Sequence, residues 1–293
     1  MVVSIAWTAG IALVLWVLAS MKTSRPDGER VRAVHPYRRL MWYIMPTRTE
    51  SLVYFDTSVD ARPIQRYAEK VRERCDIDIS HLLVAAVDAG LRANPRMNRF
   101  IVGRRLYQRD GRWVTFSMKR KAMDSRAKLS VVKLRMVDDE SIEDLVRRIN
   151  DRIGEERSGE KTYADKEYSL FNLLPRPVLW GATRLLRVLD YYNLMPGAFI
   201  ETDGLYTSVF IANLGSIGMA PGYHHLFEWG TCPLFMMVGK IRDEPVVEDG
   251  EIVVRPRMPI RWSYDERIDD GLTARKGLDA VVEALEKPER FLS

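Results

Sequence analysis

The segment from Met258 to Leu285 constrains the fold of this chain more than any other. Residues Met258 to Tyr264 have the pattern of a strand, and an acidic turn follows that ends at Gly271. From Leu272 to Leu285, apolar residues recur at helical spacing. A strand that passes through a short charged turn into an amphipathic helix indicates a sheet with helices packed on it. Such turns often carry catalytic groups.

The rest of the chain mixes strands and helices in an α/β or α+β order. Strands are predicted at 51–59, 100–107, 113–120 and 127–137, and helices at 64–75, 79–91 and 142–153. The helix at 79–91 is apolar on most faces, which is typical of a buried helix. We interpret His81 at its start as a packing or capping residue rather than a ligand. Residues 246–257 contain the hairpin signal Glu248-Asp249-Gly250.

Composition excludes several classes of function. The 45 Lys and Arg residues and 40 Asp and Glu residues are dispersed along the 293-residue chain, so we expect a solvated surface and no nucleic-acid partner. Cys75 and Cys232 lie far apart, without a Cys-x-x-Cys motif or a Cys/His cluster. We therefore expect no metal site and no disulfide framework.

The N-terminus predicts a membrane anchor. Residues 2–21 carry no formal charge, and as a helix they would extend about 30 Å, the thickness of a bilayer's hydrocarbon core. A cleaved signal peptide is the alternative, but no Lys or Arg precedes the run and the run is long for that purpose. Lys22, Arg25, Arg30 and Arg32 follow, so the positive-inside rule places the domain in the cytoplasm as a single-pass membrane protein. Residues 22–37 are expected to be a linker.

The segment 170–199 is a separate amphipathic stretch. Its leucines and valines recur at helical spacing, with Arg176, Arg184 and Arg187 among them. One interpretation is packing in the core or between subunits. The other is a helix that lies in the membrane interface beside the anchor.

Two motifs near the C-terminus resemble a known family. The turn Asp265-Glu266-Arg267-Ile268-Asp269-Asp270-Gly271 resembles the signature Asp-His-Arg-x-x-Asp/Asn-Gly of the acyltransferase (E2) catalytic domains of 2-oxoacid dehydrogenase complexes and of chloramphenicol acetyltransferase. Residues 208–218, which include Asn213-Leu214-Gly215-Ser216-Ile217-Gly218, resemble the E2 motif Thr-Phe-Thr-Ile-Ser-Asn-Leu-Gly-x-x-Gly. The resemblance covers roughly residues 38–292, weakly in the first half.

The resemblance implies a fold and an assembly. It predicts a chloramphenicol acetyltransferase-like mixed sheet flanked by helices over residues 38–293, with a helical insertion at about 170–199. It also implies a homotrimer with an active-site channel between neighbouring subunits. The substrate expected from the family is an acyl thioester of coenzyme A or an acyl carrier, with no bound cofactor.

The two residues that carry the family's chemistry are replaced in this chain. The family's His removes a proton and its Ser donates to the oxyanion, and these positions hold Glu266 and Ala212. A general base is worth about 10²–10⁴ in rate and one oxyanion donor about 10²–10³, so both changes matter. Glu266 could act as a base if burial raised its pKa; Asp265, Asp269 and Asp270 would favour this and Arg267 would oppose it.

The predicted catalytic residues are therefore Glu266, Asp270 and His225, and the predicted substrate-binding residues are Asn213, Ser216 and His224. Asp265, Arg267, Gly271 and Ala212 are expected to hold the site's structure. A surface or packing role for His224 and His225 is the competing interpretation. Two functions remain: a membrane-anchored acyltransferase with altered catalytic residues, or an inactive E2-like scaffold or acyl-CoA-binding regulator at the membrane.

Overall fold

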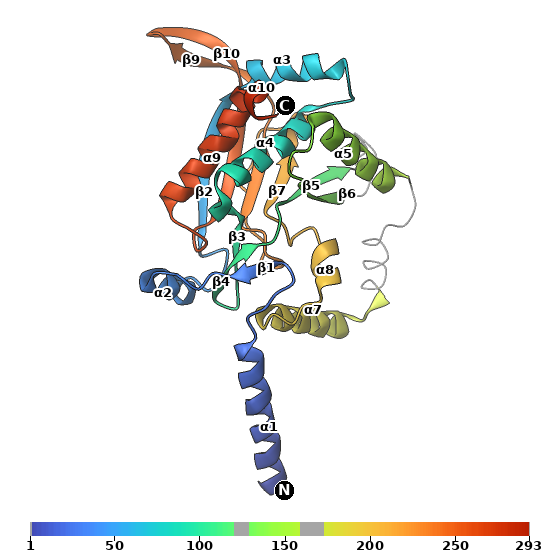
Figure 1. The fold of residues 1–293 in the computed structure, drawn as a ribbon, viewed down its shortest axis with the longest axis vertical. Helices are drawn as coiled ribbons and strands as arrows, with labels where there is room; N and C mark the ends of the chain where they lie inside the picture. Colours follow the sequence, from blue (N-terminus) through green and yellow to red (C-terminus); the bar gives the residue numbers. More distant parts are fainter. Residues whose placement is uncertain (1, 120–128, 159–172, 293) are drawn as a thin grey trace.

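The computed structural model describes residues 2–119, 129–158 and 173–292; the side chains of residues 2–6, 8, 9 and 119 lie outside this description. A large mixed sheet forms the centre of the domain, with helices over one face and a small sheet at one end (Figure 1). From that same end, helix α1 (Val2–Met21) projects away from the domain.

The central sheet has the order β2-β10-β8-β7-β5-β6. Strand β7 pairs in parallel with both β5 and β8, and the other pairs are antiparallel. This confirms the predicted mixed sheet. The strands are β2 (Leu52–Asp60), β5 (Trp113–Lys119), β6 (Leu129–Arg135), β7 (Val209–Asn213), β8 (Leu234–Val238) and β10 (Glu251–Asp265). Strand β9 (Arg242–Glu248) forms the predicted hairpin with the first half of β10, and this hairpin extends beyond the other strands.

The helices on one face of the sheet form the main core with it. They are α3 (Ala61–Arg72), α4 (Ile79–Ala93), α5 (Ile142–Arg157), α9 (Gly271–Glu286) and α10 (Pro288–Phe291). Helix α4 is buried along most of its length, as its composition predicted, and contacts α9. A Cβ on Gly90 would come within 2.3 Å of the Val281 side chain, so the glycine permits this close approach. His81 forms a capping box with Asp78 and contacts Asn150, which confirms the capping interpretation.

The small sheet differs from the sequence prediction. Residues 100–107 were expected to be one strand, but they form β3 (Arg99–Val102) and β4 (Arg105–Arg109), joined at Gly103 and Arg104, which both have positive φ. The single-strand prediction was wrong because two consecutive left-handed residues reverse the chain there. Strand β1 (Gly28–Arg30) pairs with β4, so part of the predicted linker is an ordered edge of this sheet.

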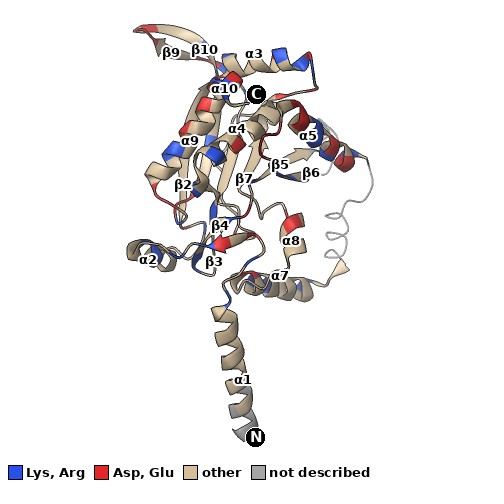
Figure 2. Ribbon diagram, viewed as in Figure 1, with Lys and Arg blue, Asp and Glu red and all other residues tan. Residues whose placement is uncertain are grey.

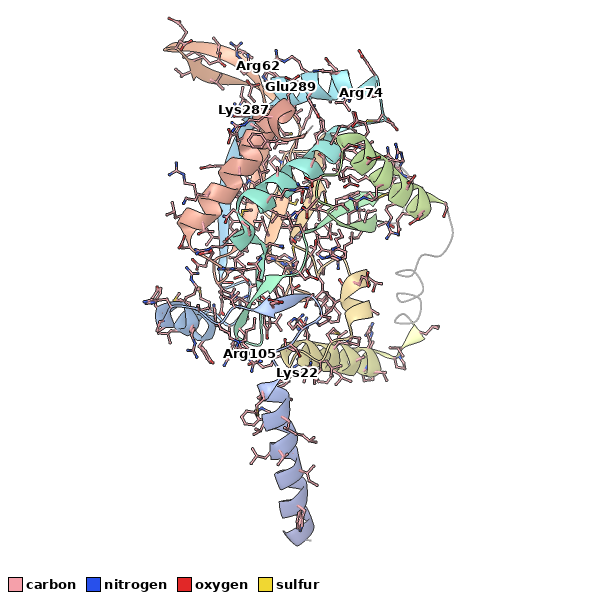
Figure 3. All side chains as sticks on the ribbon, viewed as in Figure 1. Lys22, Arg62, Arg74, Arg105, Lys287 and Glu289 are labelled. Atoms are coloured by element: carbon pink, nitrogen blue, oxygen red, sulfur yellow. The ribbon has the colours of Figure 1, made fainter. Side chains whose placement is uncertain are left out.

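Three helices gather where α1 leaves the domain: α2 (Pro36–Ile44), α7 (Arg176–Tyr191) and α8 (Gly197–Thr202). Lys22 and Arg105 mark this junction in Figure 3, where the Arg105 guanidinium donates to the carbonyl oxygens of Lys22 and Ser20. Helix α7 has no fully buried residue, and its partly buried Leu186 contacts only a small apolar cluster, so α7 is not a helix of the main core. Residues 170–172 of the predicted segment lie outside the described residues. Within the described part of the chain, no helix is both long and apolar enough to cross a membrane.

Candidate functional site

The turn after β10 is held by a buried ion pair. The Asp265 carboxylate accepts hydrogen bonds from Arg267 Nε at 2.9 Å, from Arg267 Nη2 at 2.8 Å and from Ser51 Oγ at 2.9 Å. Burial opposes the charged form of the guanidinium, but the hydrogen bonds and charge of Asp265 outweigh it and raise the pKa of Arg267. Asp265 and Arg267 therefore fix the backbone on both sides of Glu266.

The Glu266 side chain is exposed, although its neighbours are buried. Its main chain is fixed, because its N–H donates to Ser51 O at 3.0 Å and its carbonyl accepts from Arg38 Nη1 at 3.3 Å. A glutamate becomes an effective base near neutral pH when burial penalises its charge. One chain alone does not bury this carboxylate, so the base role requires a further surface to cover it.

Asp270 and Gly271 start helix α9. The Asp270 carboxylate accepts a hydrogen bond from Thr273 N at 2.9 Å, and this N-cap bond lowers the pKa of Asp270. No heavy atom lies within 4 Å of a Cβ built on Gly271, so the space around this glycine would accept a side chain. Asp270 thus has a helix-capping function in addition to any function in catalysis.

The second motif lies where β7 ends. Asn213 Oδ1 accepts from Ser216 N at 3.2 Å and so caps the short 3₁₀ helix η2 (Leu214–Ile217), while Asn213 Nδ2 donates to Ser80 Oγ at 3.2 Å. A Cβ on Gly215 would lie 2.6 Å from the Gly239 carbonyl oxygen, so the end of β8 can pass only because this residue is glycine. A cavity of about 380 Å³ adjoins Asn213 and Ser216 and is also lined by Ser80, Arg72, Lys240 and Met258.

Ala212 lies on the other face of the sheet, the face without the core helices. It is buried in a small cluster with Phe210, Phe235 and Met237. Its methyl group offers no hydrogen bond, and the cluster around it is apolar. Ala212, which the resemblance aligns with an oxyanion donor, therefore has an apolar packing role in this structure.

His224 and His225 pack on this same face. The His224 ring stacks on Phe235, with ring centroids 4.3 Å apart, and the His225 ring stacks on His224 at 4.9 Å. His225 Nδ1 lies 3.0 Å from Leu226 O, and the ring is exposed. This geometry favours packing for His224, whereas among the described residues no hydrogen bond reaches Nε2 of the exposed His225 ring.

Strand register separates the two motifs within one chain. Asn213 pairs with Val238, and Val238 pairs with Ile260 on β10. Glu266 follows Ile260 by six residues and lies two strands away from β7, so the two side chains are about 20 Å apart at the usual rise and spacing of strands. His224 stacks on Phe235, which pairs with Ser263. Along the strand direction, His224 therefore lies between Asn213 and Glu266. One chain cannot bring Glu266 and Asn213 to the same reacting atom.

Sequence reasoning missed a buried arginine beside the turn. Arg48 donates to Phe227 O at 3.2 Å and to Ile101 O at 3.4 Å, and burial lowers its pKa. It lines two adjoining cavities of about 300 and 150 Å³, the smaller of which also contacts Arg267. No periodic pattern marks this position, because the contacts come from segments far apart in the sequence.

Other catalytic chemistry finds little support in the described residues. None of them form a group of three or more His, Cys, Asp or Glu that could hold a metal ion. Burial raises the pKa of the Cys232 thiol to about 11, so it is protonated at neutral pH and unsuited to act as a nucleophile. The candidate site therefore consists of the two motifs and the histidines between them.

Comparisons with known proteins show which folds and families this chain resembles. Residues 202–293 match the family model described as 2-oxoacid dehydrogenases acyltransferase (catalytic domain). A 51-residue segment is 55% identical to the dihydrolipoyllysine-residue succinyltransferase component of the 2-oxoglutarate dehydrogenase complex of Cupriavidus necator; it covers 17% of this chain and only 12% of that protein.

Solved structures extend the likeness to the whole fold. A probable dihydrolipoamide acetyltransferase from Listeria monocytogenes superposes with a TM-score of 0.59 at 20% identity, over 89% of this chain and 95% of its own. The cubic core of the pyruvate dehydrogenase multienzyme complex gives 0.58 at 16% identity, over 90% and 95%. A chloramphenicol acetyltransferase gives 0.52 at 12% identity, over 88% and 99%.

These likenesses define the class of domain. The fold is that of the chloramphenicol acetyltransferase-like proteins. Its last third, which contains both motifs, matches the catalytic domain of the E2-type acyltransferases.

Proposed function

We propose that this chain is a membrane-anchored acyltransferase of the E2 type that acts on an acyl thioester, with coenzyme A as the thiol. The observation that carries the proposal is the turn from Asp265 to Gly271, which keeps the family's frame in a chloramphenicol acetyltransferase-like fold. The buried Asp265–Arg267 pair holds the residue between them at the end of a central strand. That residue is the one that the resemblance assigns as the base.

The reaction requires a base and a thiol leaving group. In the proposed direction the Glu266 carboxylate takes the proton of the acceptor's hydroxyl or thiol as that atom attacks the thioester carbonyl. The tetrahedral intermediate then expels the coenzyme A thiolate when the C–S bond breaks, and the thiolate is protonated by the carboxyl. The oxyanion would be stabilised by Asn213 Nδ2 in place of the family's Ser, because Ala212 has no donor.

The active unit is proposed to be a homotrimer. Glu266 and Asn213 lie about 20 Å apart in one chain, so a shared site needs Glu266 of one copy and Asn213 of the next. A second copy over the exposed Glu266 would also supply the burial that a carboxylate base needs. The solved pyruvate dehydrogenase core, whose fold this chain shares, is itself an assembly.

The membrane part of the proposal rests on residues 2–21. Most described side chains of α1 are exposed and apolar, including Ile11, Leu15 and Leu18, and the helix extends away from the domain (Figure 2 shows no charged residue along it). Water does not favour such a surface, whereas a bilayer does. Lys22, Arg30 and Arg32 after it favour a cytoplasmic domain.

An inactive scaffold or acyl-CoA-binding regulator is the second candidate. Two observations favour it: Ala212 is buried among apolar side chains, and Glu266 is exposed in the single chain. Under this second proposal, Glu266 and Ala212 stand where the resemblance expects the family's His and Ser, and the domain keeps only the fold.

Thiol release from a panel of acyl-CoA esters by the full chain in detergent, with a primary alcohol added as the acyl acceptor, separates the two candidates. The acyltransferase predicts release that falls about 10²-fold or more in Glu266→Gln, as for the loss of a general base. Glu251→Gln is the matched control, since Glu251 is exposed on the β9–β10 hairpin. Binding of acyl-CoA without release in either protein would support the regulator.

A further inference from the structure

The end of the domain from which α1 leaves carries a second apolar surface. On α7, the exposed side chains include Val178, Trp180, Leu185 and Val188. On α2, they include Tyr37, Leu40, Tyr43 and Ile44. Both helices lie at this end and run across the direction of α1 (Figure 1). We call the exposed sides of α2 and α7 the basal face.

The orientation of α7 against α1 is fixed by contacts at their junction. Trp16 Nε1 donates to Tyr192 Oη at 3.1 Å, and Asn193 Nδ2 donates to Lys22 O at 2.9 Å. Arg25 pairs with both Asp27 and Asp190, and its side chain is fully buried in that cluster. A flexible linker would let the domain reorient relative to α1. These contacts instead hold α7 beside residues 16–22.

The side of α7 turned toward the domain is identified by Leu186. This residue packs against Met195, Ile200 and Tyr206. The exposed valines, Leu185 and Trp180 occupy the remaining surface of the helix and therefore face away from the domain. No part of the described chain covers them.

The charges beside the apolar residues are positive. Arg176, Arg184 and Arg187 are exposed on α7, with Arg184 stacked on Trp180 at 4.6 Å, and Arg39 is exposed on α2. The described part of α7 has a single acidic residue, Asp190, which is paired with Arg25. Trp and Tyr with Arg at their edges are typical of helices that lie in the headgroup region of a bilayer, with arginines on anionic headgroups.

We propose that the basal face lies on an anionic phospholipid surface, so that the catalytic domain rests flat on the membrane. This inference rests on the proposed anchor, since α1 sets the level of α7. A second copy of the chain is the competing occupant of the basal face. It would have to bury the arginines of α7, and the described residues of α2 and α7 provide no acidic patch to pair with them.

The proposal has a consequence for the candidate site. Buried Trp42 of α2 donates from Nε1 to Arg267 O at 3.2 Å, and Arg38 of α2 donates to Glu266 O at 3.3 Å. The Glu266 turn is therefore attached directly to a helix of the basal face. An acyl acceptor attached to a membrane lipid would therefore be close to this turn, whereas a soluble acceptor would have to diffuse to it from the bulk solution.

Photocrosslinking of the full chain in vesicles tests the proposal. The vesicles contain phosphatidylcholine and phosphatidylglycerol, with a photoreactive group on the phosphatidylglycerol headgroup, and labelled peptides are located by mass spectrometry. We expect labels near Met21 at the domain end of α1, in residues 173–192 and in 36–44, and none in the β9–β10 hairpin, whose exposed Ile252 and Val254 are also apolar. Labels near Met21 with none in α2 or α7 would overturn the basal face and leave the anchor intact. No label near Met21 would overturn the anchor itself.

A charge variant tests the preference for anionic lipid. Arg184→Gln with Arg187→Gln should lower the α7 label by up to about 25-fold, because each basic residue at a membrane surface is worth about a fivefold factor. Lys287→Gln with Arg74→Gln removes the same charge at the opposite end of the domain (Figure 3) and should leave the α7 label unchanged. An equal loss of the α7 label in both variants would show that net charge, rather than the arginines of α7, controls binding. This result would overturn the assignment of the basal face. An α7 that is unlabelled but protected from a water-soluble reagent would identify a second copy as the occupant.

Discussion

Breaking the Asp265–Arg267 pair tests whether it holds the Glu266 turn. The two side chains are 1% and 5% exposed, and the carboxylate accepts four hydrogen bonds from Arg267 and Ser51. Asp265→Asn keeps the shape but leaves the guanidinium charge buried without its partner. Removal of one member of a buried pair costs about 3–5 kcal/mol, so we expect a loss of unfolding free energy of about 3 kcal/mol or more.

The assay is urea unfolding of the full chain in detergent, followed by circular dichroism. Asp279→Asn is the matched control, because its ion pair with Arg275 is exposed and such pairs contribute about 0–1 kcal/mol. The double variant Asp265→Asn with Arg267→Met should recover part of the loss, since it removes the unpaired charge as well. A single variant as stable as the control would refute the view that this pair organises the turn.

Three further predictions follow from the packing and titration of the fold. Gly90→Ala places a Cβ 2.3 Å from the Val281 side chain and should lower the unfolding free energy by about 1–3 kcal/mol. The control Gly181→Ala, with nothing within 4 Å of its Cβ, should be neutral or stabilising. Equal effects of the two variants in a denaturant titration would contradict the α4–α9 contact. Burial opposes the charged form of His81, but Asp78 outweighs it and raises the pKa of His81. The difference in unfolding free energy between wild type and His81→Gln should therefore be largest below about pH 6.5 and shrink as the pH rises through the pKa of the folded state. A difference that grows with pH would contradict a raised pKa. Because burial raises the pKa of Cys232 to about 11, an aromatic disulfide reagent should react with it at pH 8 only after unfolding, and immediate reaction of both thiols would contradict its burial.

Parts of the fold could be predicted from sequence because local patterns determine them. The helix 79–91 is apolar on most faces, and α4 is buried as predicted. The strand predicted from Met258 to Tyr264 is the part of β10 that lies between β2 and β8. Its first half, from Glu251 to Arg257, pairs only with β9 along most of its length and has the polar alternation of an exposed hairpin.

Other parts depend on contacts that no local pattern records. Strand β1 forms because Gly28 pairs with Arg109, and the Arg25–Asp27–Asp190 cluster joins residues that are 165 positions apart. The exposure of α7 likewise cannot be deduced from its periodicity, since a core helix and an interfacial helix share the same amphipathic pattern.

The sequence motifs predict candidate members of the site but not their geometry. The motifs identify Glu266, Asp270 and Asn213, and sequence alone does not reveal that strand register places Glu266 and Asn213 about 20 Å apart in one chain. Arg48 was missed because its partners, Phe227 and Ile101, come from distant loops and strands.

Complementation between two variants tests the central claim most directly. Glu266→Gln and Asn213→Ala chains are purified separately, confirmed as folded by circular dichroism, then mixed after mild dissociation and assayed for thiol release from acyl-CoA. If each site joins Glu266 of one copy to Asn213 of the next, both parents are nearly inactive and random mixing restores about a quarter of the wild-type sites. A mixture that stays at the level of its parents, beside an active wild type, would contradict a site shared between copies.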